Sequence, residues 1–263
     1  NLPTSIGVSE DVLTAVTGIS FSDVDAGSNP VTVTLAAGSG ALTALSGGGV
    51  IVAGSGSSTL VLSGSVSAIN NFIATSQVGF TTVANSSSDV TLAVTIDDGG
   101  NSGSGGVQSA NGSVTLDVSA VNDAPSVAAP GSIAVTEDVA SALTGISFTD
   151  VDAGSNPVTV TLAVNAGTLA AVSGSGVSVG GSATSLTLSG SISDINSFIA
   201  AGKVGFTTAS NDTGNVTLTT SIHDGGNTGS GGAKSDSTTT TLSVSAVNDA
   251  PVNQLPGSMT VKE

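Results

Sequence analysis

The chain has almost no basic residues. Nineteen aspartates and glutamates face three lysines, and the formal net charge is -16. Such a surface repels nucleic acid and anionic lipid headgroups, which argues against both as partners. Hard divalent cations are bound by clustered oxygen ligands, so calcium is a natural counter-ion for this chain. The alternative, that the acidity serves only solubility, explains the composition equally well.

Cysteine, tryptophan and tyrosine are also absent, and the only aromatic residues are six phenylalanines. Without cysteine there is no disulfide framework and no thiolate metal site. Without tryptophan or tyrosine, a carbohydrate-stacking platform is disfavoured, because such platforms use aromatic faces. No apolar run approaches about eighteen residues and no export signal is recognisable, so we expect no membrane span in this piece.

Valine, isoleucine and leucine recur in short alternating segments between turns rich in glycine, serine, asparagine and aspartate. This pattern predicts an all-β fold made of tandem antiparallel Greek-key β-sandwiches. One short helical turn per repeat is predicted at Ile69, Phe72 and Ile73 and again around Phe198, from their i, i+3, i+4 spacing. The strands expected in the first repeat are 6–8, 18–21, 31–35, 50–52, 60–62, 90–96 and 114–118.

The sequence repeats itself. The segment SEDVLTAVTGISFSDVDAGSNPVTVTLA from Ser9 recurs from Thr136 as TEDVASALTGISFTDVDAGSNPVTVTLA, at an offset of 127. After a one-residue deletion near Gly56 the offset is 126, and VNDAP at Val121 recurs at Val247. Units of this length can each bury a core of their own. We therefore predict two domains, 1–125 and 126–251, and the start of a third repeat at 252–263.

The acidic residues concentrate in a few loops: Glu10-Asp11, DVDAGSN from Asp23, DDGGN from Asp97, and Asn122-Asp123 after the last strand. Alternate loops of a sandwich share an end, so the loops at Asp23 and Asp98 are expected together, with Asn122-Asp123 at the opposite end. For each loop the alternative is turn formation, because aspartate and asparagine side chains bond their own backbone.

Three of these segments, in this order, resemble cadherin-type domains, specifically the cadherin-like (Ig-like) tandem repeats of large bacterial surface adhesins of the biofilm and RTX type. DVDAGSNPVTVTL at Asp150 resembles the cadherin DxDxGxN segment, HDGG at His223 its AxDG segment, and VNDAP at Val121 its interdomain linker. The resemblance covers both repeats. It implies an extracellular, cell-surface protein that binds Ca²⁺.

Carried over residue by residue, the resemblance implies a calcium site at the junction of the two repeats, formed by Glu10, Asn122, Asp123, Asp150, Asp152, Asp224 and a backbone carbonyl near Asn156. The equivalent set Asp23, Asp25 and Asp98 would serve a preceding repeat, and Glu137, Asn248 and Asp249 a following one. Ala120 and Ala246 replace the first linker aspartate of cadherins, and no DRE-like segment lies between Phe80 and Val90. We therefore expect one or two ions per junction, each with six to eight oxygen ligands, rather than three ions.

The function implied is that of calcium-rigidified extender (stalk) repeats supporting cell adhesion and biofilm formation. The partners would be neighbouring repeats of the same chain, and a host, cell or abiotic surface reached through other domains. Three alternatives remain: a ligand-binding adhesive module, an accessory domain of a secreted enzyme, and a calcium-independent spacer.

Catalysis is not expected, because the sequence has no cysteine nucleophile, HExxH or GxSxG motif. The single histidine, His223, has Asp97 as its counterpart and so lacks a repeated role. Threonines 238–241 fit an ordered ice-binding array or, more simply, the two faces of one strand.

Overall fold

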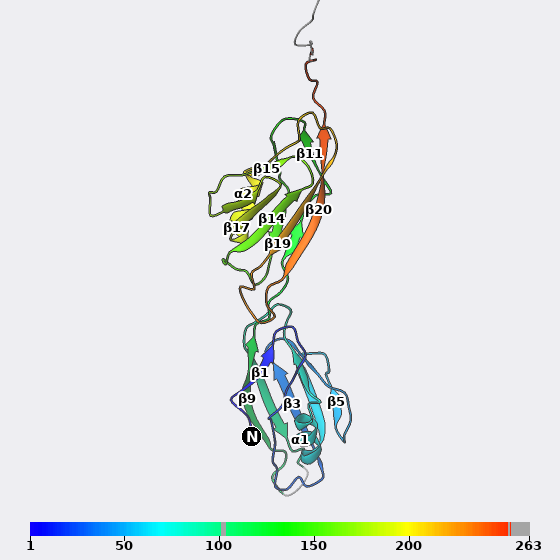
Figure 1. Cartoon of the computed structure of the whole chain (residues 1–263). Coiled ribbons are helices and arrows are strands. Elements are labelled where there is room, and N and C mark those ends of the chain that lie inside the picture. The colour runs from blue at the N-terminus through cyan, green and yellow to red at the C-terminus, as the bar shows by residue number, and fades with distance from the viewer. Residues whose placement is uncertain (101–103, 252, 254–263) are drawn as a thin grey trace, which may run out of the picture. The chain divides into compact units, whose positions relative to one another are not determined.

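The computed structural model describes residues 1–100, 104–251 and 253 (Figure 1). The chain divides into two compact units. Unit 1 comprises Asn1–Asp123 and Gly226–Gly232, and unit 2 comprises Ala124–Gly225 and Ala233–Glu263. Apart from Asn253, the predicted start of a third repeat at 252–263 lies outside the described residues. No helix in the described part of the chain is long and apolar enough to cross a membrane.

Unit 1 contains a six-stranded and a three-stranded sheet. The larger has the order β1 (Ser5–Ser9), β9 (Ser109–Ser119), β8 (Val90–Asp97), β3 (Pro30–Ala37), β6 (Thr59–Ser65) and β5 (Ile51–Ala53). The smaller has the order β2 (Thr14–Ala15), β7 (Gly79–Thr81) and β4 (Ala41–Thr43). Because β3 lies between β8 and β6, the chain crosses over between non-consecutive strands.

Unit 2 repeats this arrangement. Its larger sheet has the order β11 (Ser132–Thr136), β20 (Ser235–Ser245), β19 (Val216–His223), β14 (Val158–Val164), β17 (Ser185–Gly190) and β16 (Ser178–Ser182). Its three-stranded sheet has the order β12 (Ser141–Ala142), β18 (Gly205–Thr207) and β15 (Thr168–Ala170). A further pair joins β10 (Ser126–Ala128) to β13 (Ser147–Thr149). The predicted all-β sandwich class is confirmed.

Two expectations about the strands are wrong in detail. Strands β1 and β11 pair in parallel with β9 and β20, the last strands of their units, with Val8 opposite Val118 in unit 1. The large sheets are therefore not wholly antiparallel. Residues 18–21 form no strand, although the equivalent β13 of unit 2 does. The difference lies in the pairing: β13 bonds to β10, and the described part of unit 1 contains no strand equivalent to β10.

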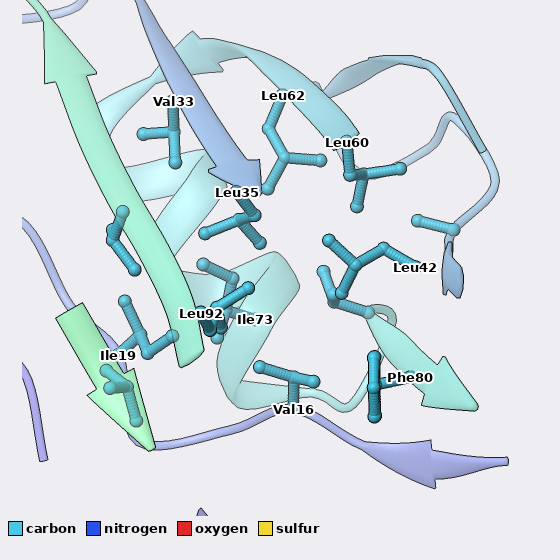
Figure 2. Packing of buried hydrophobic residues seen from close by; sticks show 14 of the residues in the cluster. Val16, Ile19, Val33, Leu35, Leu42, Leu60, Leu62, Ile73, Phe80 and Leu92 are labelled. Atoms are coloured by element: carbon cyan, nitrogen blue, oxygen red, sulfur yellow. The ribbon is translucent and has the colours of Figure 1, made fainter. Parts of the chain in front are cut away.

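Each unit has its own core, which follows from the alternation of its strands. In β3, Val31, Val33, Leu35 and Ala37 are buried, while Thr32 and Thr34 lie on the other face. Figure 2 shows Val33 and Leu35 of β3 beside Leu62 of the neighbouring strand β6 in the core of unit 1. Phe80 and its counterpart Phe206 are fully buried from the small sheets. Burial of a large apolar side chain contributes roughly 1.5–3 kcal/mol, so these buried side chains stabilise each unit.

The predicted helical turn is confirmed but is longer than a single turn. Helices α1 (Val66–Ala74) and α2 (Ile192–Ala200) each begin at a serine, Ser65 or Ser191, whose hydroxyl accepts the N–H of the third residue on. The face that carries Phe72 or Phe198 is buried in the core. The helix is thus held by its own cap and by core packing.

An asparagine on each helix bonds the backbone of the segment before the first acidic loop. Asn70 Oδ1 accepts the N–H of Phe21 at 2.8 Å, and its Nδ2 donates to the Phe21 carbonyl at 2.9 Å. Asn196 makes the same two bonds to Phe148, both at 2.9 Å. The helix therefore fixes the chain just before the DVDAGSN loop in each repeat.

Candidate metal centre

A carboxylate cluster lies at the end of strand β11 in unit 2. Because β11 and β20 are parallel neighbours that end in register at Thr136 and Ser245, the residues after each strand come together. Glu137 is only 3% exposed, and its Oε2 accepts the N–H of Val247 at 2.9 Å. Carboxylate oxygens of Glu137, Asp138 and Asp249 all lie within 4.8 Å of one another. This is the spacing at which several oxygens can share one cation.

Asp138 is positioned by the backbone of two loops. It adopts a positive φ of 56°, and its N–H donates to Thr208 Oγ1 at 2.9 Å. Its own Oδ1 accepts the N–H of Asn211 at 3.1 Å. These bonds hold the carboxylate at the edge of the unit, beside the buried Glu137.

Unit 1 shares part of this arrangement. Glu10 is 1% exposed, and its Oε2 accepts the N–H of Val121 at 3.1 Å. The N–H of Asn85 donates to Asp11 Oδ1 at 3.0 Å. With its Nδ2 turned toward the carboxylates, the Asn85 amide lies 3.1 Å from Asp123 Oδ2 and from Asp11 Oδ2. The first repeat therefore also has a buried glutamate bonded to its last segment, and Asp11 and Asp123 both lie within reach of the Asn85 amide. Among the described residues, three carboxylates within 4.8 Å of one another occur only in unit 2.

The DVDAGSN loop of unit 2 contains an unsatisfied carboxylate oxygen. Asp150 Oδ1 accepts the N–H groups of Asp152 and Ala153 at 2.9 and 3.1 Å. Asp150 Oδ2 is buried and has no hydrogen-bond partner. A buried polar atom without a partner costs free energy, and a cation would supply what the protein does not.

The corresponding loop of unit 1 carries a perturbed acid. The hydrogen bond with the Asp25 side chain lowers the pKa of Asp23 below its ordinary value of 3.8, and the N–H groups of Asp25 and Ala26 act in the same direction. These two N–H groups both lie 3.1 Å from Asp23 Oδ1. The loop thus favours the ionised form of Asp23, the form that binds a cation.

The two glycine-containing acidic loops of unit 1 meet, as the strand order predicted. Asp23 and Asp98 line the same surface hollow, together with Gln108. Asp98 Oδ1 accepts the N–H groups of Gly100 and Gln108, each at 2.8 Å. In unit 2 the equivalent of Asp98 is Asp224, which is 1% exposed and accepts the N–H of Lys234 at 2.8 Å. Both aspartates also shape their own loops, which was the alternative role considered for them.

The remaining predicted ligands have mixed environments. Asn122 is buried in unit 1, where its Nδ2 donates to the Gly232 carbonyl at 2.9 Å. The Asn156 N–H donates to the carbonyl of Ala153 at 2.8 Å, inside its own loop. Asn248 is exposed, and so is Asp249. Asn122 and Asp123 belong to unit 1 and Asp150, Asp152 and Asp224 to unit 2, so the predicted site at the junction of the repeats stays a prediction.

Sequence reasoning missed Asp11 and Asp138 as possible ligands, and the two asparagines that hold them. The signal was present: the Glu-Asp pair occurs at the same place in both repeats, and Asn85 recurs as Asn211. Asn85 lies in the segment between Phe80 and Val90, where the resemblance had led to a search for an acidic motif. His223, in contrast, is exposed and its Nδ1 accepts the N–H of Gly225 at 3.1 Å, which supports a role in the turn.

The residues present fit a hard cation such as calcium. All the clustered side-chain donors are oxygens, the chain has no cysteine, and the buried Asp150 Oδ2 needs a positive partner. Calcium prefers carboxylate and carbonyl oxygens and tolerates irregular geometry. Zinc, which favours nitrogen and sulfur ligands, does not match this set.

Comparison with known proteins finds distant structural similarity. No protein-family model matches the sequence, and no curated protein matches it. Among solved structures, protocadherin gammaB7 EC3-6 is 16% identical over 94% of this chain and 46% of that chain, with a TM-score of 0.40. Mouse cadherin-23 EC22-24 is 16% identical over 94% and 65%, with a TM-score of 0.43. Human mucin-like protocadherin EC1-2 is 15% identical over 93% and 96%, with a TM-score of 0.42. The chain spans about half of the length of the protocadherin gammaB7 structure and about two thirds of the length of the cadherin-23 structure.

Proposed function

We propose that this chain consists of calcium-binding extender repeats of an extracellular bacterial adhesin, which calcium stiffens into a stalk that supports cell adhesion and biofilm formation. The observation that carries the proposal is the cluster of Glu137, Asp138 and Asp249 in unit 2. Its glutamate has a buried counterpart in unit 1, Glu10, which accepts the equivalent backbone N–H. A buried, backbone-anchored glutamate that recurs at the same place in both repeats serves a purpose beyond solubility.

Repulsion gives the cluster its functional meaning. Carboxylates held within 4.8 Å repel each other, and their mutual repulsion is only partly screened near a protein surface. The three lysines of the chain cannot neutralise nineteen acids. Calcium would remove this repulsion and fix the end of the repeat, where the segment VNDAP leads into the next repeat in sequence. The ligands proposed for the ends of the repeats are Glu10, Asp11, Asn122, Asp123, Glu137, Asp138, Asn248 and Asp249, and those proposed for the loops are Asp23, Asp25, Asp98, Asp150, Asp152, Asn156 and Asp224.

Titration calorimetry with calcium tests the binding on which the proposal depends. Extracellular calcium modules bind with dissociation constants of about 10⁻⁴ to 10⁻³ M, and we expect the chain to fall in or below this range. Asp138→Asn should raise the calcium dissociation constant of at least one site about tenfold. This corresponds to a loss of about 1.4 kcal/mol of binding free energy. Asp194→Asn, a matched change of an aspartate on helix α2, should leave every site unchanged. Absence of binding at millimolar calcium, or equal effects of the two variants, would overturn the proposal.

A further inference from the structure

A glycine-rich loop of the second repeat belongs to unit 1. The loop runs from 224 to 234, between β19 and β20, and its middle part, Gly226–Gly232, groups with Asn1–Asp123 rather than with its neighbours in sequence. It contains the sequence GGNTGSGG at 225–232, which matches GGNSGSGG at 99–106. Neither the acidic clusters nor the hydrophobic cores account for this repeated motif.

This part of the loop, the strap (226–232), bonds the backbone that follows β9. The Asn122 N–H donates to the Ser230 carbonyl at 2.8 Å, and the Ser230 N–H donates to the Ala120 carbonyl at 2.9 Å. The two bonds form a parallel bridge between Val121 and Ser230. Backbone pairing of this kind satisfies polar groups that burial would otherwise leave unpaired.

The strap also holds the side chain of Asn122. Asn122 Nδ2 donates to the Gly232 carbonyl at 2.9 Å, and the residue is 1% exposed. An asparagine amide has an oxygen that can bind a cation and a nitrogen that can only donate. The bond to Gly232 therefore fixes the direction in which the amide of Asn122 presents its oxygen.

Only glycine fits where the strap approaches the backbone most closely. Gly229 has a positive φ of 82°, and a Cβ atom there would lie 2.5 Å from the Asn122 nitrogen and 2.6 Å from the Val121 carbonyl carbon. Gly231 also has a positive φ, 110°, but a Cβ atom there would meet nothing within 4 Å. Both positions favour glycine by conformation, and Gly229 requires it for contact as well.

Comparison of the two repeats shows what the strap covers. Asn122 is buried, whereas Asn248, its equivalent in unit 2, is exposed. Each asparagine follows a valine whose N–H donates to a buried glutamate, Glu10 or Glu137. In the described part of the chain, no bridge like that of the strap reaches Val247. The strap therefore accounts for the burial of Asn122, which the rest of the repeat does not provide.

We propose that the strap closes on residues 120–122 without calcium and holds Asn122 in position for the ion. The bonds of Ser230 and Gly232 join neutral groups, so they do not require the acids to be neutralised first. A ligand that is already in place binds an ion without the cost of ordering it. Only the ligand role of Asn122 rests on the calcium function proposed above, and the closure of the strap does not.

Amide hydrogen exchange of the intact chain in chelator, followed residue by residue by NMR, tests the closure. Asn122 and Asn248 both lie in the sequence VNDAP, so their amides have the same local sequence context. The Asn122 amide should exchange at least about tenfold more slowly than the Asn248 amide, because the strap must open first. Rates that agree within about twofold would show an open strap and would overturn the proposal. This comparison needs no substitution.

Two glycine substitutions in the strap form a matched pair. Gly229→Ala places a methyl group against the backbone of 120–122, so the Asn122 amide should exchange within about twofold of the Asn248 amide. Gly231→Ala places the same group in open space and should keep most of the protection. Equal loss in both variants would show an effect of loop strain alone and would contradict a close contact at Gly229.

Calcium titration of the same two variants tests the positioning of Asn122. Gly229→Ala should raise the calcium dissociation constant of one site at least about fivefold relative to Gly231→Ala. An unchanged dissociation constant in a chain whose strap has opened would overturn the positioning role. Absence of calcium binding to the unmodified chain would instead overturn the calcium function, and the exchange rates in chelator would still decide whether the strap closes.

Discussion

Glu137 Oε2 accepts the backbone N–H of Val247 at 2.9 Å, which ties the start of the second repeat to its last segment. Glu10 makes the same bond to Val121 at 3.1 Å. Both glutamates are nearly completely buried, although the chain has very few basic residues to pair with them. The carboxylate therefore has two tasks that mutations can separate: it accepts a backbone hydrogen bond, and it supplies negative charge to the cluster.

Replacement of Glu137 separates these tasks. Glu137→Gln keeps an acceptor for the Val247 N–H but removes the charge, so it should weaken calcium binding while unit 2 stays stable in chelator. Glu137→Ala also leaves the partly buried Val247 N–H without this acceptor and should destabilise unit 2 by about 1 kcal/mol. Urea unfolding in chelator checks the difference. Equal stability of the two variants would show that the bond to Val247 contributes nothing.

The asparagine on helix α1 should be important for the stability of unit 1. Asn70→Ala removes both bonds to the Phe21 backbone and leaves partly buried groups unpaired, which should cost about 1–3 kcal/mol. Its neighbour Asn71 is exposed, so Asn71→Ala is the matched control and should change stability by less than about 0.5 kcal/mol. Thermal unfolding followed by circular dichroism distinguishes the two variants. Similar losses for both would contradict a specific role for Asn70.

One substitution in the core of unit 2 should increase its stability. Thr220 is fully buried and its hydroxyl has no hydrogen-bond partner, whereas the equivalent residue of unit 1 is Val94. Thr220→Val removes the unpaired hydroxyl at nearly constant volume, so it should stabilise unit 2 by about 1–2 kcal/mol. The reverse change, Val94→Thr, should destabilise unit 1 by a similar amount. A destabilising Thr220→Val would mean that the hydroxyl is satisfied in solution.

The strand pattern, the helix position and the meeting of the two acidic loops were all predictable from sequence, because alternation and the repeat offset report directly on burial. The details that depend on which strands pair with each other were not predictable from sequence. Residues 18–21 have the pattern of a strand, but a strand also needs a neighbour to pair with. The parallel pairing of β1 with β9 depends on which edge the first segment joins, and local sequence does not encode that choice.

The candidate site was predictable only in part. The resemblance to cadherin-type domains pointed to Glu137 and Asp249, which the structure brings together. Asp138 follows Glu137 directly and was missed as a ligand, because whether it turns toward its neighbour depends on the backbone at its positive φ and on the bond from Asn211. Such loop geometry is set by tertiary contacts rather than by local propensity.

The pKa of the Asp23 carboxyl should lie below its ordinary value of 3.8. The main cause is the hydrogen bond with the Asp25 side chain, and the backbone N–H groups of Asp25 and Ala26 add to it. A lowered pKa stabilises the folded state above the unfolded-state pKa, and this contribution is lost as pH falls through the folded-state pKa. Carbon-detected NMR titration in chelator measures the midpoint. Asp25→Ala should move the Asp23 midpoint up toward 3.8. A midpoint at or above 3.8 in the unmodified chain would contradict the described hydrogen bonds.

Small-angle X-ray scattering of the two-repeat chain, with calcium and then with excess chelator at fixed ionic strength, tests the stiffened-stalk proposal most directly. We predict a narrow distribution of distances with calcium, a broader one with chelator, and no calcium effect in Asp150→Asn. Magnesium, which demands a more regular shell, should not replace calcium at equal concentration. Scattering profiles that superimpose with and without calcium would contradict the proposal and leave a calcium-independent acidic spacer.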